Sequence, residues 1–231
     1  MRVDIGIIGA MKPEVEGLVA QLGSLTCERV SGIDFYSGEL FGKRVCVAQC
    51  GIGKVFAAIC AEVMILKYSP SLIVNTGVGG ALSGELLPCD TVIATSLVQH
   101  DMDTSAIGDP RGLVSGINKI HFEADTRAAD ILLRAADTLG LRAFSGIIAT
   151  GDKFIASGAD KDDIVENFSA SACEMEGCAI AQTAFVNNTP FAVIRAISDS
   201  ADGHSTIDYP VFLPIAVKNS TSLTLALIKE W

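Results

Sequence analysis

The composition of this 231-residue chain excludes several classes of protein. Hydrophobic residues make up 49% and charged residues 19%, which is enough apolar material for a core and too little charge for a disordered chain. The formal net charge of −10 argues against nucleic acids and anionic membranes as partners, because both attract basic surfaces. We therefore expect a small molecule as the ligand.

The N-terminal segment and the cysteines indicate a cytoplasmic protein. Arg2 and Asp4 lie within a short apolar run, which does not fit a secretory signal. No stretch of the sequence approaches the roughly 20 apolar residues that span a bilayer. The seven cysteines form no CxxC pair, which favours reduced and mostly buried thiols.

The predicted elements alternate between strands and helices. In chain order they are a strand at 3–9, a helix at 13–22, a hairpin at 33–40 and 43–49, a helix at 54–68, strands at 72–76 and 90–99, a polar loop at 100–116, a helix at 125–140, a strand at 143–150, a helix at 174–187, a strand at 191–197 and a helix at 209–228. This order predicts an α/β fold, a three-layer α/β/α arrangement with a central mixed, mostly parallel sheet. Since no repeat or linker interrupts it, we expect a single domain over residues 1–231.

The strand at 191–197 indicates where the function lies. It is an almost unbroken apolar run with one Arg, as a fully buried strand is. An open α/β sheet places its ligand crevice at the carboxyl ends of its strands. Arg195, Ser198, Asp199 and Asp202 are therefore expected to face a site.

Carboxylates occur at three separate predicted sheet ends. Glu14 lies one turn into the first helix, Glu174 and Glu176 open the helix at 174–187, and Asp199 follows the last strand. Each has an alternative interpretation, as a solvated helix start for the glutamates and as a cap for Asp199. Together they provide what general acid and base catalysis requires.

Glycine turns supply weaker signals. Gly6-Ile7-Ile8-Gly9 lacks the third glycine of a dinucleotide fingerprint, so we expect no nicotinamide cofactor, and no other cofactor is indicated. The turns at 51–53 and 77–80 would let backbone N–H groups approach one shared ligand.

Neither a metal nor a histidine base is expected. His100, Asp101 and Asp103 lie together, but no second His or Cys stands at a ligand spacing. His204, between Gly203 and Ser205, is interpreted as a loop residue rather than a catalytic base.

Six segments, in order along nearly the whole chain, resemble the 5′-methylthioadenosine/S-adenosylhomocysteine nucleosidases of the nucleoside phosphorylase/hydrolase family. They are GIIGAMKPEV at 6–15, GIGKV at 51–55, NTG at 75–77, GDKFI at 151–155, EMEGCAIA at 174–181 and RAISDSAD at 195–202. The resemblance implies a nucleoside phosphorylase-like α/β/α domain, a homodimer, and hydrolysis of the N-glycosidic bond of an adenine nucleoside.

The resemblance also implies catalytic roles. Asp199 would protonate adenine N7, a role that requires a protonated carboxyl near neutral pH, and Glu14 would activate the attacking water. Glu176 would bind the ribose hydroxyls. Cleavage of an N-glycosidic bond passes through an oxocarbenium-like state and needs an acid for the leaving group and a base for the water, which these residues would supply.

The implied substrate contacts surround these three residues. Phe154 would stack on adenine while the Ile155 backbone reads its edge, and Met175 would pack under the ribose. Ser198 and Arg195 would orient Asp199, and Glu174 would have a lesser supporting role. The further expected contacts are Met11, Val78, an apolar wall of Ile52, Tyr209 and Phe212, and Ile107 from the loop of a neighbouring subunit.

Two departures from the family pattern bear on specificity. Val78 stands where the family has a Ser after Asn-Thr-Gly. The missing hydroxyl favours hydrolysis over phosphorolysis. It also removes a hydrogen bond worth about 1 kcal/mol. Ile107 and Asp109 stand in the loop at 104–110 where aromatics are common, so a more polar lid would suit a 5′ substituent with an amine, or a futalosine.

Other functions stay open at this point. A phosphorylase of the same fold, a hydrolase of another adenine nucleoside such as aminodeoxyfutalosine, and a non-catalytic nucleoside-binding protein all fit the fold. The joint presence of Glu14, Glu176 and Asp199 favours the hydrolase.

Overall fold

The computed structural model describes residues 2–202 and 205–231 and folds them around one ten-stranded sheet. The strands are β1 Ile5–Gly9, β2 Gly23–Val30, β3 Ile33–Leu40, β4 Lys43–Gln49, β5 Leu72–Ala81, β6 Thr91–Gln99, β7 Phe122–Glu123, β8 Ala143–Thr150, β9 Ala172–Glu174 and β10 Phe191–Asp199. The helices are α1 Lys12–Val19, α2 Lys54–Tyr68, the 3₁₀ turn η1 Ser105–Ile107, α3 Thr126–Leu139, α4 Gly158–Phe168, α5 Gly177–Val186 and α6 Ser205–Glu230.

The sheet is mixed, and part of it closes on itself. Its strand order is β10-β6-β8-β9-β5-β1-β4-β3-β2, with β7 paired to β6. Parallel pairs join β5 to β1 and β10, β1 to β4, and β8 to β6 and β9. Because β10 pairs with both β5 and β6, the strands β5, β10, β6, β8 and β9 form a ring.

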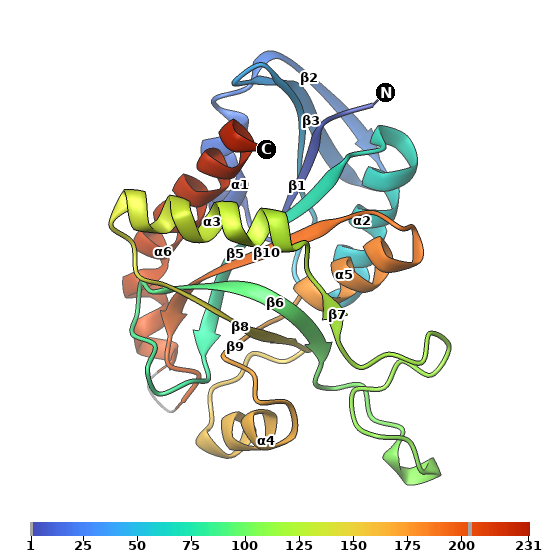
Figure 1. Cartoon of the computed structure of the whole chain (residues 1–231), viewed down its shortest axis with the longest axis vertical. Helices are drawn as coiled ribbons and strands as arrows, with labels where there is room; N and C mark the ends of the chain where they lie inside the picture. Colours follow the sequence, from blue (N-terminus) through green and yellow to red (C-terminus); the bar gives the residue numbers. More distant parts are fainter. Residues whose placement is uncertain (1, 203–204) are drawn as a thin grey trace.

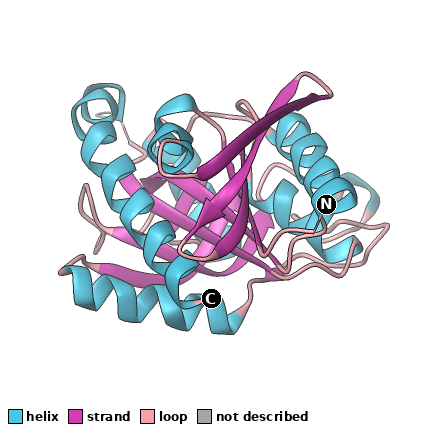
Figure 2. Cartoon of the chain, turned by 90° about the horizontal axis from the view of Figure 1, so that it is seen from above, coloured by secondary structure: helices cyan, strands magenta, loops and turns pink. Residues whose placement is uncertain are grey.

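Helices cover both faces of the sheet, which confirms the predicted three-layer α/β fold. Figure 1 shows α1, α3 and α6 on one side of the strands and α2 and α5 on the other, and Figure 2 shows the strands between them. Leu18, Ile131 and Leu223 pack in the core of the first side, and Met64 and Ile180 in that of the second. The burial of apolar side chains on both faces explains why the central strands are nearly continuous apolar runs.

The last helix is longer and more apolar than the sequence analysis allowed. Asp208–Glu230 is long and apolar enough to cross a membrane by length and composition. In the fold α6 packs against β5, β10, α1 and α3, and Leu223 and Leu227 are fully buried there. It is therefore placed as a core helix of the domain.

Most predicted elements lie where the sequence placed them. The hairpin at 33–40 and 43–49, the helix at 54–68 and the strand at 143–150 are confirmed at the same residues. The turn at 51–53 is also confirmed, since Gly51 and Gly53 have φ of 94° and 100°, a backbone that favours glycine. The loop interpretation of Gly203 and His204 lies outside the described residues.

Two expectations were wrong. The glycines at 77–80 do not form a turn, because β5 continues through them to Ala81. The helix expected from 174 begins at Gly177, so Glu174 ends β9 and Glu176 is the N-cap residue of α5.

The sequence left β2, β7, β9, α4 and the 3₁₀ turn η1 unassigned, and β2 and α4 are the longest of these. β2 has no buried residue and therefore no apolar alternation, because it is an edge strand paired only with β3. α4 shows little of a core face, since among its residues only Ile164 and Phe168 are buried.

Candidate active site

A cavity of about 240 Å³ lies at the carboxyl ends of β1, β5 and β10. This is the place that the sheet-end rule predicted. The residues that line it are Ala10, Met11, Glu14, Ile52, Val78, Gly79, Gly80, Lys153, Phe154, Ile155, Cys173, Glu174, Met175, Glu176, Ser198, Asp199 and Tyr209.

Glu14 is held in the cavity by main-chain donors. Its Oε2 accepts hydrogen bonds from the N–H groups of Ala10 and Met11, both at 2.8 Å, and its Oε1 accepts one from Val78 N–H at 3.1 Å. Glu14 is only 3% exposed. Burial raises the pKa of this carboxyl above its ordinary value, although the charge of Arg195 and the three N–H donors oppose the rise.

The glycines of β5 make room for this carboxylate. A Cβ on Gly77 would stand 2.5 Å from Glu14 Oε1, and a Cβ on Gly79 would stand 2.8 Å from the Cys173 carbonyl oxygen. A side chain at either position would displace its neighbour. Close approach of the chains, rather than a turn, is therefore what these glycines provide.

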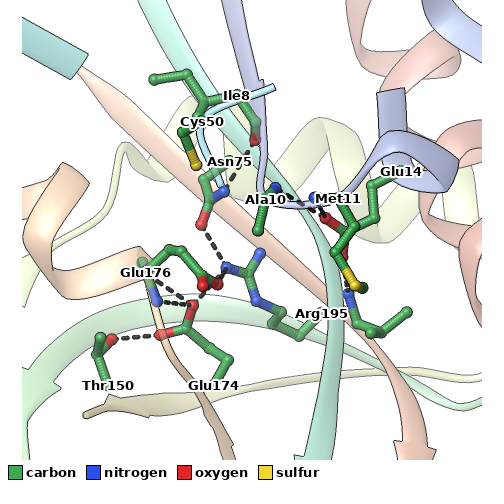
Figure 3. A network of polar contacts seen from close by, with 12 residues as sticks. Ile8, Ala10, Met11, Glu14, Cys50, Asn75, Thr150, Glu174, Glu176 and Arg195 are labelled. Carbon is green, nitrogen blue, oxygen red and sulfur yellow. Dashed lines mark hydrogen bonds and ion pairs between the residues drawn. The ribbon is translucent and has the colours of Figure 1, made fainter. Parts of the chain in front are cut away.

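Beneath the cavity, Arg195 joins three strands through a buried network (Figure 3). Its Nη2 donates to Glu174 Oε2 and to Asn75 Oδ1, and Asn75 Nδ2 donates to the Ile8 carbonyl at 2.9 Å. Thr150 donates to the other oxygen of Glu174. Arg195 was expected to orient Asp199, but its described contacts go to Glu174, Glu176, Asn75 and the Ile194 carbonyl instead.

Glu174 has a larger part than the supporting role expected for it. Besides Arg195 and Thr150, its Oε2 accepts the N–H groups of Glu176 at 2.9 Å and Gly177 at 2.6 Å. It therefore fixes the backbone that presents Glu176 to the cavity.

Glu176 is buried against this network. Its Oε1 accepts the Gly53 N–H at 2.9 Å, and its Oε2 lies 3.9 Å from Arg195 Nη2. Burial, with the neighbouring charge of Glu174, raises the pKa of Glu176 to about 7, against the opposing charge of Arg195. A carboxyl of this kind changes its protonation near neutral pH.

Asp199 closes the cavity at the end of β10 and is 2% exposed. Its Oδ2 lies 2.9 Å from the donor Ser198 Oγ, and its Oδ1 accepts the Ala201 N–H at 2.9 Å. Ser198 Oγ is also 3.3 Å from the Gly79 carbonyl oxygen. Of the two residues expected to orient Asp199, Ser198 does so.

Two aromatic side chains form part of the cavity wall. The rings of Phe154 and Tyr209 meet edge to face with centroids 5.8 Å apart, and Phe154 is 46% exposed. Tyr209 donates its hydroxyl to Met11 Sδ at 3.3 Å. An exposed ring beside buried carboxylates offers a face on which a planar base can stack.

The predicted site residues that line the cavity are Met11, Glu14, Ile52, Val78, Phe154, Ile155, Glu174, Met175, Glu176, Ser198, Asp199 and Tyr209. Arg195 lies beneath it, and Phe212 and Asp202 are not among its lining residues. Ile107 is 82% exposed in η1, on a loop that Figure 1 shows protruding from the body of the molecule.

Asn75, Thr150, Lys153 and Cys173 contribute to the site without having been assigned a role from the sequence. Asn75 is the last but one residue of the predicted strand at 72–76, and Thr150 is the last residue of the predicted strand at 143–150. The same sheet-end rule that drew attention to Asp199 could have found them.

The described residues, 2–202 and 205–231, include no group of three or more His, Cys, Asp or Glu side chains that could hold a metal ion. Asp101 instead pairs with Lys54 at 2.6 Å.

Comparison with known proteins gives a consistent result over the whole chain. Residues 4–229 match the family model of the phosphorylase superfamily. The 5′-methylthioadenosine/S-adenosylhomocysteine nucleosidase of Shewanella halifaxensis is 39% identical over 228 residues, which cover 98% of this chain and 99% of that protein.

Solved structures of two similar proteins superpose closely. The 5′-methylthioadenosine/S-adenosylhomocysteine nucleosidase of Neisseria meningitidis, in complex with methylthio-immucillin-A, has a TM-score of 0.95 at 36% identity, covering 99% of each chain. The futalosine hydrolase of Helicobacter pylori has a TM-score of 0.94 at 31% identity, covering 99% of this chain and 98% of that one.

Proposed function

The chain belongs to the 5′-methylthioadenosine/S-adenosylhomocysteine nucleosidases of the phosphorylase superfamily, which are N-glycosyl hydrolases. We propose that it cleaves an adenine nucleoside with Asp199, Glu14 and Glu176 as its catalytic residues. The observation that supports these roles most strongly is the convergence of three buried carboxyl groups on one cavity. Water is the second substrate, and the products are adenine and the 5′-thioribose.

Asp199 acts as the general acid toward adenine N7. The proton that it donates neutralises the leaving base as the ribosyl C–N bond breaks. The single hydroxyl proton of Ser198 can serve only one of its two acceptors, Asp199 Oδ2 and the Gly79 carbonyl. Either contact keeps Ser198 Oγ beside the Asp199 carboxyl, which supports a fixed position for the acid.

Glu14 activates the attacking water. Its position is fixed by three N–H donors before any substrate binds, and a raised pKa makes it a stronger base than an exposed carboxylate. Water that loses a proton to Glu14 attacks the anomeric carbon of the ribose.

Glu176 binds the ribose hydroxyls and faces the positive charge that develops on the sugar. The transition state resembles an oxocarbenium ion, and a buried carboxylate stabilises such a charge more than water does. Met175 packs against the sugar and Phe154 stacks on the adenine, with the Ile155 main chain at the edge of the base.

Hydrolysis is favoured over phosphorolysis because the described residues that line the cavity offer no anion site. Val78 offers no hydroxyl, and its N–H is already bound to Glu14. Lys153 is the one cation among the described lining residues, and it pairs with Asp160 at 2.7 Å. A phosphate dianion would therefore meet carboxylates rather than donors.

Adenine release tests the proposal. The protein is incubated with 5′-methylthioadenosine in phosphate-free buffer and again with phosphate, and the products are separated by chromatography. We expect adenine and free methylthioribose in both buffers. Methylthioribose 1-phosphate formed only with phosphate would show a phosphorylase, and intact substrate in both would leave an inert binder or another nucleoside.

The 5′ group is the finer part of the proposal. Asp109, which motivated the expectation of a polar lid, accepts hydrogen bonds from Thr104 at 2.8 Å and Ser115 at 3.0 Å. It therefore braces its own loop, and we expect methylthioadenosine and S-adenosylhomocysteine to be cleaved. Parallel assays with aminodeoxyfutalosine measure the alternative, and preference for that substrate would contradict the assignment.

We also propose a homodimer in which the loop at 104–110 covers the neighbour's cavity. Ile52 of the cavity lining and Val55, Phe56 and Ile59 of the following helix α2 are between 41% and 70% exposed, and Ile107 is more exposed still. Light scattering tests this, and a monomer at working concentration would contradict it.

The single-domain organisation and cytoplasmic location stay proposals as well. All seven cysteines, which lie within the described residues, are free thiols, as a reducing compartment keeps them. No metal is invoked, so activity is expected to survive a chelator.

A further inference from the structure

Lys161 of α4 joins the ends of two strands beside the candidate acid. Its Nζ donates to the Ala81 carbonyl oxygen at 2.9 Å and to the Ser200 carbonyl oxygen at 2.8 Å. Ala81 is the last residue of β5, and Ser200 directly follows Asp199 at the end of β10. Because these partners are 80 and 39 residues away in the chain, the contact depends on the tertiary fold.

The Ser200 carbonyl belongs to the same peptide group as the N–H that holds Asp199. The Ala201 N–H donates to Asp199 Oδ1 at 2.9 Å, and Ala201 is fully buried. A peptide group is planar, so a contact that fixes its carbonyl also fixes the direction of its N–H. A positive charge on the carbonyl side also polarises the group and strengthens the N–H as a donor.

We propose that Lys161 is a positioning residue for the catalytic acid, holding the Ser200–Ala201 peptide so that Asp199 keeps its place for proton transfer. The inference rests on the proposed function, in which Asp199 is that acid. Lys161 does not line the cavity, so it acts through the peptide and not on the substrate.

A role in anchoring α4 alone does not account for these contacts. The helix already has an N-cap at Ser157, whose side chain accepts the Asp160 N–H, and it buries Ile164 and Phe168. Within the described residues Lys161 forms no ion pair with a carboxylate, and both of its hydrogen bonds go to main-chain carbonyls. Its full charge is thus directed at the two strand ends next to Asp199.

Three variants test the proposal by steady-state adenine release. Lys161→Met removes the charge and the donors, and Lys161→Arg keeps both. Lys119→Met makes the same exchange at a partly buried lysine that is paired with Glu123 and does not line the cavity. We expect Lys161→Met to lower kcat about 10- to 100-fold with KM nearly unchanged, the cost of a misplaced catalytic group. Lys161→Arg should recover most of kcat, and Lys119→Met should match the wild type.

A normal kcat in Lys161→Met would overturn the proposal. It would also be overturned if kcat falls together with the melting temperature and Lys161→Arg does not recover it. If the Met variant does not fold, Lys161→Gln replaces it.

The crystal structure of the same variant gives a readout that does not depend on activity. We expect the Ala201 N to Asp199 Oδ1 distance to lengthen beyond about 3.5 Å, the limit of a hydrogen bond. If the Ala201 N to Asp199 Oδ1 contact is unchanged in the variant, the inference about Lys161 is refuted, whatever the activity of the wild type. If the wild type releases no adenine, the proposed function is refuted instead.

Discussion

The charges around the cavity and the charges between α3 and α6 are arranged in opposite ways. At the cavity, Glu14, Glu174, Glu176 and Asp199 are each at most 8% exposed, with one buried cation, Arg195, among them. Between α3 and α6, Arg134 pairs with Glu230 while the two side chains stay 60% and 51% exposed. One set has been removed from water, and the other has not.

This contrast indicates that the buried carboxyl groups at the cavity are not present for stability. Burying a charge costs free energy that one partner rarely returns in full, and here several acidic groups share one arginine. An exposed pair costs little and contributes little. A surplus of buried carboxylates beside a cavity is understandable if they meet a positive charge, as they do when a glycosidic bond breaks.

The largest expected effect is on catalysis at Asp199. Asp199→Asn keeps the shape of the side chain but cannot give up a proton, so we expect kcat to fall about a thousandfold, equivalent to about 4 kcal/mol. Adenine release measures the rate and thermal melting checks the fold. A variant within threefold of the wild type would show that the acid lies elsewhere.

Removing the shared cation should have the next largest effect. Arg195→Met leaves Glu174 and Glu176 buried without their partner, and we expect the free energy of unfolding to fall by about 3–5 kcal/mol. Urea denaturation at pH 7 measures it. A loss below about 1 kcal/mol would mean that the buried network resembles the surface pairs after all.

The pH dependence of stability should reveal Glu176. Its pKa is about 7 in the fold against 4.5 for the free side chain, so the folded chain keeps a proton that the unfolded chain has lost. The contribution of Glu176 to stability is therefore full below pH 4.5 and is lost as pH rises to 7, by an amount on the order of 3 kcal/mol.

Urea denaturation of the wild type and of Glu176→Gln at pH 5 and pH 7.5 isolates the contribution of Glu176 to the free energy of unfolding. We expect the wild type to lose stability between the two pH values relative to the variant. Parallel pH profiles of the two proteins would contradict the raised pKa.

The smallest effect is expected at the surface. Arg134→Met is the same exchange as Arg195→Met, made at an exposed pair, and we expect it to change the free energy of unfolding by no more than about 1 kcal/mol. A larger loss in the same urea titration would remove the contrast between the two regions.

The sequence predicted the parts of the fold that leave a periodic pattern. The hairpin around Phe41 and Gly42 and the helix at 54–68 were found to the residue, because apolar spacing and glycine mark their limits. β2 was missed because an exposed edge strand has no buried face to leave a pattern. The start of α5 was misplaced because Glu174 forms contacts across the fold that no local pattern records.

The candidate site could be predicted in its residues but not in its connections. Glu14, Glu176 and Asp199 stand where strand ends and family motifs place them. The side-chain hydrogen-bond partners of Arg195 and the carbonyl partners of Lys161 lie 21 to 120 positions away, so only the structure reveals these contacts. The glycines of β5 resemble a turn in sequence, and only the 2.5 Å approach to Glu14 explains them.

We expect the buried carboxyl groups to perform chemistry rather than simply to shape a binding pocket. Single-turnover adenine release by Glu14→Gln, with adenine binding measured on the same sample by calorimetry, separates the two roles. We predict normal adenine binding and a release rate lower by a factor of about 100 or more, since a water without its base attacks slowly. Normal binding together with a wild-type rate would contradict the account.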